Sequence, residues 1–131
     1  MKKKQKQIPF EFILEELDRA APYTRPMFGA VGVYIGEKII FILRDRPTST
    51  EDNGVWLATT GEHHQSLQKV FPNMRSLKMF GPGPTGWQIL PLDADDFEES
   101  TMKACQLVLK NDVRIGKVPK TKLKSAKKIK P

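Results

Sequence analysis

The sequence predicts one α+β domain in which an antiparallel or mixed sheet of five strands packs against three helices. Two patterns predict this class. Short β-prone runs follow one another across turn residues, and three other segments repeat apolar residues at steps of three and four. The predicted order is α-β-β-β-α-β-β-α, and strands segregated from a few helices are typical of an α+β fold. A length of 131 residues agrees with a single domain.

The first helix is predicted over residues 9–21. Pro9 suits the first turn of a helix, and Pro22 stops the helix because the residue before a proline disfavours helical geometry. An apolar stripe at steps of three and four indicates the face that packs on the sheet. It consists of Phe10, Ile13, Leu14, Leu17 and Ala21.

The stretch GAVGVYIGEKI, residues 29–39, has the glycines and the lysine of a phosphate-binding loop. Its spacing excludes that loop. Three residues rather than four separate Gly32 from Gly36, and Glu37 stands between Gly36 and Lys38. The glycine pattern of dinucleotide-binding folds is missing too, and a β-prone run follows where a helix is required.

The same stretch instead predicts a β-hairpin. A Gly36-Glu37 turn of type II′, in which the glycine tolerates a positive φ, joins strands at 27–35 and 38–43. Glycines inside a strand mark a bulge or a close packing partner. We therefore expect a helix or the N-terminal segment to lie across the glycines of the first strand.

The polar stretch RDRPTSTEDNG, residues 44–54, predicts an exposed loop, and a short third strand follows at 55–58. Thr59 and Glu62 have the spacing of a capping box. They predict a second helix over about 61–71, which the next proline closes.

Two further strands are predicted at 76–80 and 86–91, with the loop GPGPTG at 81–86 between them. The last helix is expected to begin at Asp93. Its acidic start suits the positive end of the helix dipole, so the structural interpretation of these acids is favoured over carboxylate chemistry. They are Asp95, Asp96, Glu98 and Glu99, and the buried face of the helix is formed by Phe97, Ala104, Cys105 and Val108.

The formal net charge of +7 is concentrated at the two ends of the chain. Residues 1–6 carry four lysines, and residues 110–131 carry eight lysines and Arg114 against Asp112. The part between holds nine Lys or Arg against fourteen Asp or Glu and is mildly acidic. We therefore expect a basic N-terminal arm at 1–7, a folded domain at 8–115 and a disordered lysine-rich tail at 116–131.

The single cysteine, Cys105, excludes an intramolecular disulfide and a multi-cysteine metal cage. This usage fits a reducing cytoplasm. Neither a signal peptide nor an apolar run of about 18 residues is found in the sequence. A cytoplasmic protein that does not enter the membrane is expected.

The run Arg25-Pro26-Met27-Phe28-Gly29, followed by Gly32-Val33-Tyr34 and a glycine turn, resembles the opening of the TfoX N-terminal domain family. Later segments match that family in order. They are GVWLA as a third strand, GWQILP as an aromatic strand that ends in proline, and DADDFEESTMKACQLVLKN as a closing helix. The resemblance covers about residues 8–112.

The resemblance implies a small α+β domain without established enzymatic activity or cofactor, in a family associated with transcriptional regulators of bacterial competence. It implies a regulatory or interaction role, with an unidentified protein partner. The motif residues expected to bind that partner are Arg25, Met27, Phe28, Gly29, Gly32 and Tyr34. The sequence departs from the family in Ala30, where a second glycine is frequent, and in the long 44–54 loop. No second domain follows, although full-length competence regulators carry one.

Other candidate sites have simpler structural explanations. His63 and His64 are adjacent and point about 100° apart on a helix, whereas a zinc pair needs the spacing i, i+4 on one face. Cys105, as a nucleophile, would need an accessible, electropositive setting, but its place on an apolar helix face predicts a buried small hydrophobe. No metal or cofactor is expected.

Arg25 has two interpretations, because it can bind an anion or a partner's carboxylate, or pair with an acid of the first helix. The strand aromatics Tyr34, Trp56 and Trp87 either stack on a partner or a base or, as most strand aromatics do, pack within the fold.

The lysine-rich tail supports the alternative function, a nonspecific nucleic-acid-binding accessory protein, because lysines gain affinity for phosphates by counterion release. The tail lysines are Lys117, Lys120, Lys122, Lys124, Lys127, Lys128 and Lys130. The structural interpretation, a plain solvated extension, is favoured over it. A third hypothesis is an enzyme or small-ligand binder with a pocket near Arg25 and the glycine-bearing hairpin.

Overall fold

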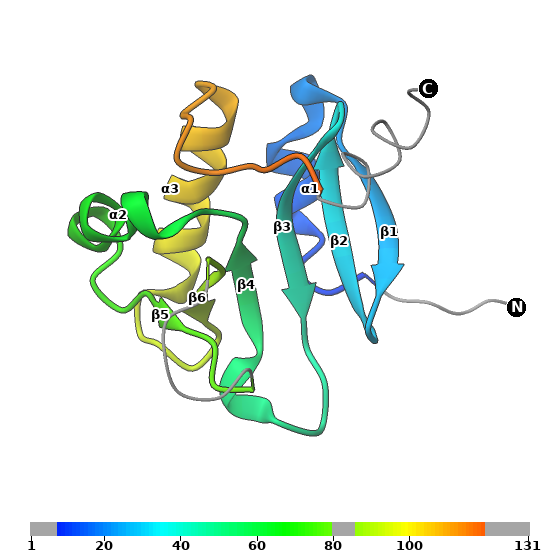
Figure 1. The fold of residues 1–131 in the computed structure, drawn as a ribbon. Coiled ribbons are helices and arrows are strands. Elements are labelled where there is room, and N and C mark those ends of the chain that lie inside the picture. The colour runs from blue at the N-terminus through cyan, green and yellow to red at the C-terminus, as the bar shows by residue number, and fades with distance from the viewer. Residues whose placement is uncertain (1–7, 80–85, 120–131) are drawn as a thin grey trace, which may run out of the picture.

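The computed structural model describes residues 8–79 and 86–119. Its centre is one antiparallel sheet (Figure 1). Within these residues the sheet has six strands in the spatial order β1-β2-β3-β4-β6-β5. They are β1 (Tyr23–Met27), β2 (Ala30–Ile35), β3 (Lys38–Arg44), β4 (Gly54–Leu57), β5 (Arg75–Ser76) and β6 (Gln88–Pro91). The α+β class is therefore confirmed, with one strand more than predicted.

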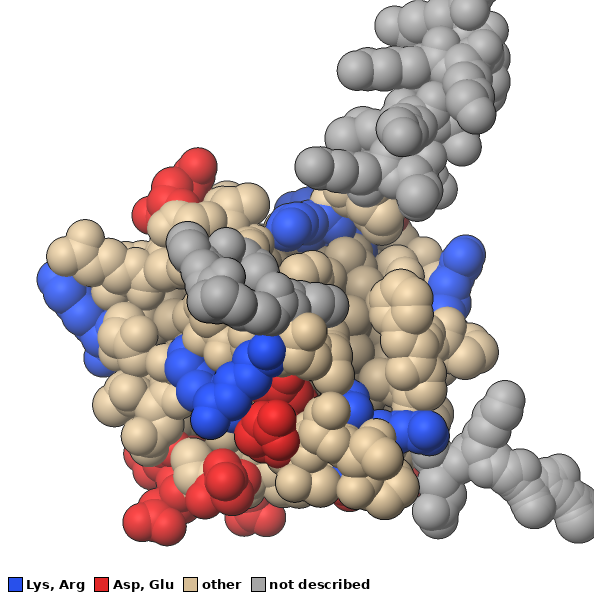
Figure 2. Space-filling view, turned by 60° about the horizontal axis from the view of Figure 1, so that its bottom comes forward, with Lys and Arg blue, Asp and Glu red and all other residues tan. Residues whose placement is uncertain are grey.

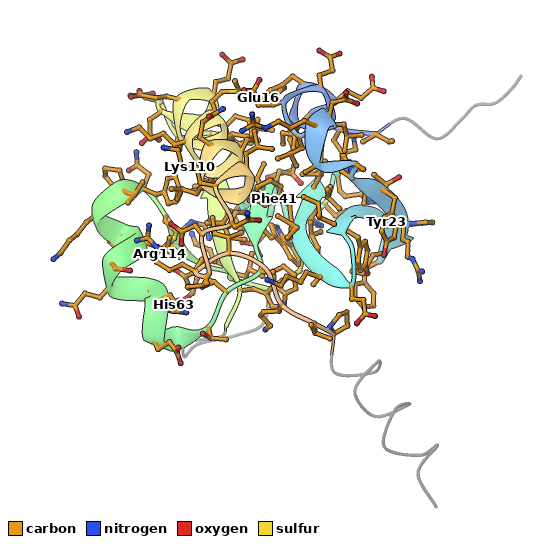
Figure 3. All side chains as sticks on the ribbon, turned by 90° about the horizontal axis from the view of Figure 1, so that it is seen from above. Glu16, Tyr23, Phe41, His63, Lys110 and Arg114 are labelled. Atoms are coloured by element: carbon orange, nitrogen blue, oxygen red, sulfur yellow. The ribbon has the colours of Figure 1, made fainter. Side chains whose placement is uncertain are left out.

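The helices cover one face of this sheet. The described residues form three α-helices and three short 3₁₀ turns, which are α1 (Phe12–Glu16), η2 (Asp18–Ala20), η3 (Thr50–Asp52), η4 (Gly61–His63), α2 (His64–Val70) and α3 (Phe97–Leu109). Ile13 of α1, Leu67 of α2 and Cys105 of α3 belong to one buried cluster with Phe41 of β3. Viewed from above, Phe41 lies between the layers (Figure 3).

The opposite face of the sheet packs against no helix of the described residues, and we call it the helix-free face. Its buried cluster contains only strand and loop residues. They are Ala30, Tyr34, Ile39, Ile42, Trp56, Ala58, Leu77 and Ile89, with Met27 and Trp87 packed against them. A bulge adjusts the register between β2 and β3, since Val33 pairs with Phe41 and Tyr34 with Ile39.

The predicted strand at 27–35 starts too early, because β2 begins at Ala30 and Met27 ends a separate strand, β1, that was not predicted. β1 and β2 are joined by a tight turn at Phe28-Gly29, whose φ angles are 52° and 76°. Two positive φ angles are typical of a type I′ hairpin turn, which usually carries Asn-Gly. Because phenylalanine is not a turn residue, the sequence pattern concealed the turn. Pro26 is tolerated because β1 is the edge strand of the sheet.

The Gly36-Glu37 turn is confirmed as the connection between β2 and β3. Ile35 pairs with Lys38 on either side of the turn, and Gly36 has a φ of 59°. The expected partner of the strand glycines is wrong for Gly32. A Cβ there would meet Tyr34 at 3.1 Å and Met27 at 3.3 Å, so neighbouring strand side chains, not a helix or the N-terminal segment, pack over Gly32.

The first helix is shorter than predicted. Phe10 has a φ of 57° and so stands outside helical geometry, and the α-helix begins at Phe12. It gives way to η2, which ends at Ala20 and is followed by Ala21 with a φ of 56°. The apolar stripe nevertheless packs as expected in the middle, where Ile13 and Leu17 are fully buried.

The 44–54 segment is only partly the exposed loop that was predicted, since it contains η3 and three buried polar side chains. Arg44 donates to the side chain of Asn53 and to the carbonyls of Thr48 and Ser49. Asn53 in turn bonds both the N–H and the carbonyl of Arg46. These bonds replace contacts with water, so the segment closes on itself.

The second helix is confirmed, but its capping box is wrong. η4 and α2 begin without a side-chain cap, and the buried hydroxyl of Thr59 has no hydrogen-bond partner among the described residues. The α3 helix also starts later than Asp93, because the backbone of Leu92 turns to bond Asn53 and that of Ala94 bonds Pro91.

The fourth predicted strand at 76–80 is wrong in extent, since β5 comprises only Arg75 and Ser76. The next N–H groups, those of Lys78 and Met79, donate to the carboxylate of Asp52 instead of to a neighbouring strand. Residue 80 and most of the predicted 81–86 loop lie outside the described residues. β6 begins at Gln88, two residues later than predicted.

The tail was predicted to begin at Gly116, but Gly116 and Lys117 belong to the folded domain. The N–H of Gly116 donates to the carbonyl of Ala58 at 2.7 Å. Lys117 forms an antiparallel bridge with Ile39. The remaining tail lysines lie outside the described residues. No helix within the described ranges is long and apolar enough to cross a membrane.

Candidate functional site

The β1–β2 hairpin carries two tyrosines and an arginine that contact one another. Tyr23 and Tyr34 are directly opposed in the register, and their rings stack with centroids 5.3 Å apart and 14° between the planes. The guanidinium carbon of Arg25 lies 5.9 Å from the centre of the Tyr23 ring and 5.5 Å from that of Tyr34. These distances are those of cation–π contacts.

Arg25 is exposed, and none of the carboxylates in the described residues lies within ion-pair distance of it. The predicted pairing with an acid of the first helix is therefore not formed. The two rings hold the side chain over the sheet and leave its N–H donors toward solvent. Tyr23 is fixed as well, because its hydroxyl donates to the carbonyl of Gly36 at 2.7 Å.

The other motif residues lie on the same hairpin. Met27 packs over Gly32, where the missing side chain leaves room for its methyl group. Gly29 closes the hairpin turn, and the Arg46 guanidinium lies against it, 3.1 Å from where a Cβ would be. The structure thus brings the six motif residues together, and Arg25, Met27 and Tyr34 lie on the helix-free face.

Phe28 stands at the tip of this hairpin with 93% of its surface exposed. Its φ of 52° is in the left-handed region, which bulky side chains rarely occupy. Both burial and backbone preference therefore disfavour phenylalanine at this position.

An apolar cavity of about 230 Å³ opens beside Phe28. Its lining is formed by Met27, Phe28, Ala30, Ile42, Arg44, Trp56 and Met79. Arg44 is 6% exposed, and its charge is met by carbonyl and amide oxygens rather than by a described carboxylate. The cavity extends the apolar surface of the hairpin toward the centre of the sheet.

A row of opposed residues crosses the helix-free face at the other end of the hairpin. Consecutive register pairs connect Tyr23, Tyr34, Ile39 and Lys117, and we call these four residues the Tyr23–Lys117 row. The ammonium group of Lys117 lies 5.6 Å from the centre of the Trp87 ring. Cations and aromatic rings therefore meet at both ends of the row.

Charge is distributed unevenly between the two layers. Exposed acids gather on α1 and around the start of α3, as Glu11, Glu15, Asp18, Asp93, Asp95, Glu98 and Glu99. Figure 2 shows Lys and Arg side chains scattered over one face, with acidic side chains beside them at its centre and a larger acidic group at its lower edge. Glu37, an exposed acid at the β2–β3 turn, lies next to the row.

The other candidate groups lie away from the β1–β2 hairpin. His63 contacts Glu62, and the His64 ring lies 3.1 Å from the Gly86 carbonyl oxygen. Viewed from above, His63 lies far from Tyr23, which stands at the outer edge of the sheet (Figure 3). No three His, Cys, Asp or Glu side chains among the described residues are grouped as metal ligands require.

Cys105 is fully buried in the core, as the apolar helix pattern predicted. Burial, and secondarily the charge of Glu16, raises the pKa of its thiol to about 12. Such a thiol stays protonated at neutral pH and cannot attack a substrate as a thiolate.

Comparison of the chain with protein-family models, curated proteins and solved structures found no match. The resemblance to the TfoX N-terminal domain family therefore stays a prediction.

Two residues of the face escaped the sequence analysis as site residues. Tyr23 follows Pro22 directly and was assigned to no element, although it alternates with Arg25 and Met27 as residues of one strand face do. Lys117 was grouped with the tail lysines. Nothing in its local sequence indicates that it pairs with Ile39, since the two positions are far apart in the chain.

Proposed function

We propose that this chain is a non-catalytic interaction domain that docks its partner on the helix-free face. The resemblance to the TfoX N-terminal domain family supports a regulatory role, linked to transcription or competence. The third hypothesis, an enzyme or small-ligand binder, has less support, because the candidate nucleophile is buried and the acids at the start of the last helix stand on the helical layer.

The single observation that carries this proposal is the exposure of Phe28 at a positive φ angle. Holding a bulky residue at positive φ costs about 1 kcal/mol or more. A side chain that is 93% exposed gains almost nothing from burial to offset that cost. A residue that opposes both local rules is expected at a functional position rather than at a structural one.

The surroundings of Phe28 have the composition of a binding surface. Aromatic residues, methionine and arginine are enriched at protein interfaces. Here Tyr23 and Met79 are about two-fifths exposed, and Arg25 is held over two tyrosine rings. The apolar cavity beside Phe28 offers room for a partner's side chain.

Site-specific cross-linking tests the proposal. A photoreactive phenylalanine analogue would replace Phe28 in the cells that make the protein, and the control would place it at Glu15, which is exposed on α1. We expect adducts from position 28 and none from position 15. Equal adducts from both positions, or none from position 28 in a folded protein, would contradict the proposal.

A further inference from the structure

The Tyr23–Lys117 row offers stacking surface at the edge of the sheet. Tyr23 is 42% exposed, and one of its faces rests on Tyr34. Because β1 is the edge strand, no described strand lies on the other side of Tyr23. The row spans three strand spacings, about 14 Å. Exposed aromatic rings beside a track of positive charge are the usual arrangement for stacking unpaired bases.

Positive charge stands at both ends of this row. Arg25 lies above the two tyrosines, and Lys117 lies above Trp87. Neither cation is within ion-pair distance of a carboxylate in the described residues. Their donors can bind phosphates on either side of the stacked bases, whereas Glu37 at the adjacent turn disfavours phosphates there.

The C-terminal lysine-rich end of the chain starts beside this face, because Lys117 pairs with Ile39. The tail lysines from Lys120 onward follow Lys117 in the sequence, and residue 119 is the last described.

From this arrangement we infer that the helix-free face binds a single-stranded polynucleotide, with bases on Tyr23 and phosphates on Arg25 and Lys117. This inference rests on the proposed function and names the partner of the same face. A duplex is disfavoured because its bases are already stacked on one another. Ribose and deoxyribose are bound alike, because no carboxylate or amide side chain in the row reads the 2′-hydroxyl.

The ring contribution is tested with full-length protein and a fluorescent oligothymidylate of about 15 nucleotides, by anisotropy. Tyr23→Phe and Tyr23→Ala both remove the hydroxyl bond to Gly36, and only the second removes the ring. We expect Tyr23→Phe to bind within about twofold of the wild type and Tyr23→Ala at least about fivefold more weakly. Unfolding curves of both variants verify that the domain is folded.

The charge contribution is tested by the salt dependence of the same binding between about 50 and 200 mM. Lys117→Gln is expected to lower the slope of log K against log salt by about 0.7, which corresponds to one lost phosphate contact. Lys69→Gln, an exposed lysine of α2, is the matched control and leaves the slope unchanged. A further variant removes the tail charge. We expect it to bind more weakly, but to keep the difference in affinity between Tyr23→Phe and Tyr23→Ala when these are introduced into it. Glutamine replaces Lys120, Lys122, Lys124, Lys127, Lys128 and Lys130.

Several results would overturn the inference. These are no binding of the oligothymidylate by the wild type, tighter binding of a matched duplex, and equal affinities of the two Tyr23 variants. Binding that depends only on the tail lysines would overturn it as well. Oligouridylate is expected to bind within about threefold of oligothymidylate, and a larger preference contradicts the indifference to the sugar. Protein adducts at position 28 without oligonucleotide binding would leave the proposed function standing and remove only this partner.

Discussion

Lys117 and Ile39 exchange two backbone hydrogen bonds, with N–O distances of 2.8 and 3.0 Å. The pair stands where β4 has ended, so the chain segment at 116–117 extends the sheet beside β3. This contact places Lys117 on the helix-free face and gives the C-terminal tail a defined starting point. It requires an unusual backbone geometry at Gly116, whose φ is 117°.

Gly116→Ala is expected to destabilise the domain by about 1–2 kcal/mol. A side chain at this φ is strained, and its Cβ would stand 3.0 Å from the Ile40 side chain. Urea unfolding measures the effect. Gly61→Ala is the matched control, because a Cβ there meets no atom within 4 Å. A Gly116→Ala variant as stable as the control would show that the segment contributes nothing to the fold.

Asp52→Asn is expected to cost about 2–4 kcal/mol of stability. The Asp52 carboxylate is fully buried and accepts from the N–H groups of Lys78 and Met79 and from Arg75. An amide presents N–H donors toward some of these donors and leaves them unsatisfied. Asp45→Asn, at an exposed position, is expected to change stability by less than about 0.5 kcal/mol. Equal unfolding midpoints for the two variants would contradict a structural role for Asp52.

The pair formed by Asp112 and Arg114 predicts a pH dependence. The side-chain hydrogen bonds from Arg114 are the main cause that lowers the pKa of Asp112 from 3.8 to about 2. A lowered pKa stabilises the fold above pH 3.8, and this contribution is lost as the pH falls through about 2. Because the pair is partly exposed, we expect Asp112→Asn to cost only about 1 kcal/mol at neutral pH. The difference from wild type should vanish near pH 2, and a constant difference would contradict this.

Cys105 is expected to resist thiol reagents in the native protein. The thiol is fully buried and its pKa is raised to about 12. At pH 8 the reagent therefore cannot reach the sulfur, and the thiol stays protonated. Reaction with a chromogenic disulfide reagent should follow the unfolding rate and become fast in denaturant. Rapid labelling of the native protein would reopen the catalytic interpretation of this cysteine.

Local patterns were sufficient for the parts of the fold in which side-chain period and turn chemistry agree. The β3 strand, the β4 strand and the Gly36 turn follow from β-prone runs and one glycine with positive φ. The limits of β5 did not follow, because Asp52 captures the N–H groups of Lys78 and Met79 through a contact distant in sequence.

The candidate site was found in part. The motif identified Arg25 and Tyr34, but the hidden strand β1 kept Tyr23 out of the prediction. The cause is the Phe28-Gly29 turn, where phenylalanine stands in place of asparagine. At this turn the sequence fails to signal its structure, and the exposed Phe28 is the residue on which the proposed function rests.

The most direct test of the proposed binding role of Phe28 is the free energy of unfolding of Phe28→Asn, from urea denaturation. Asparagine suits a positive φ before glycine, and the exposed ring contributes no burial. We predict that the variant is about 0.5–1 kcal/mol more stable than the wild type, because it lacks the backbone strain of Phe28. A variant that is less stable by a similar amount would show that Phe28 supports the fold, and would contradict its assignment to partner binding.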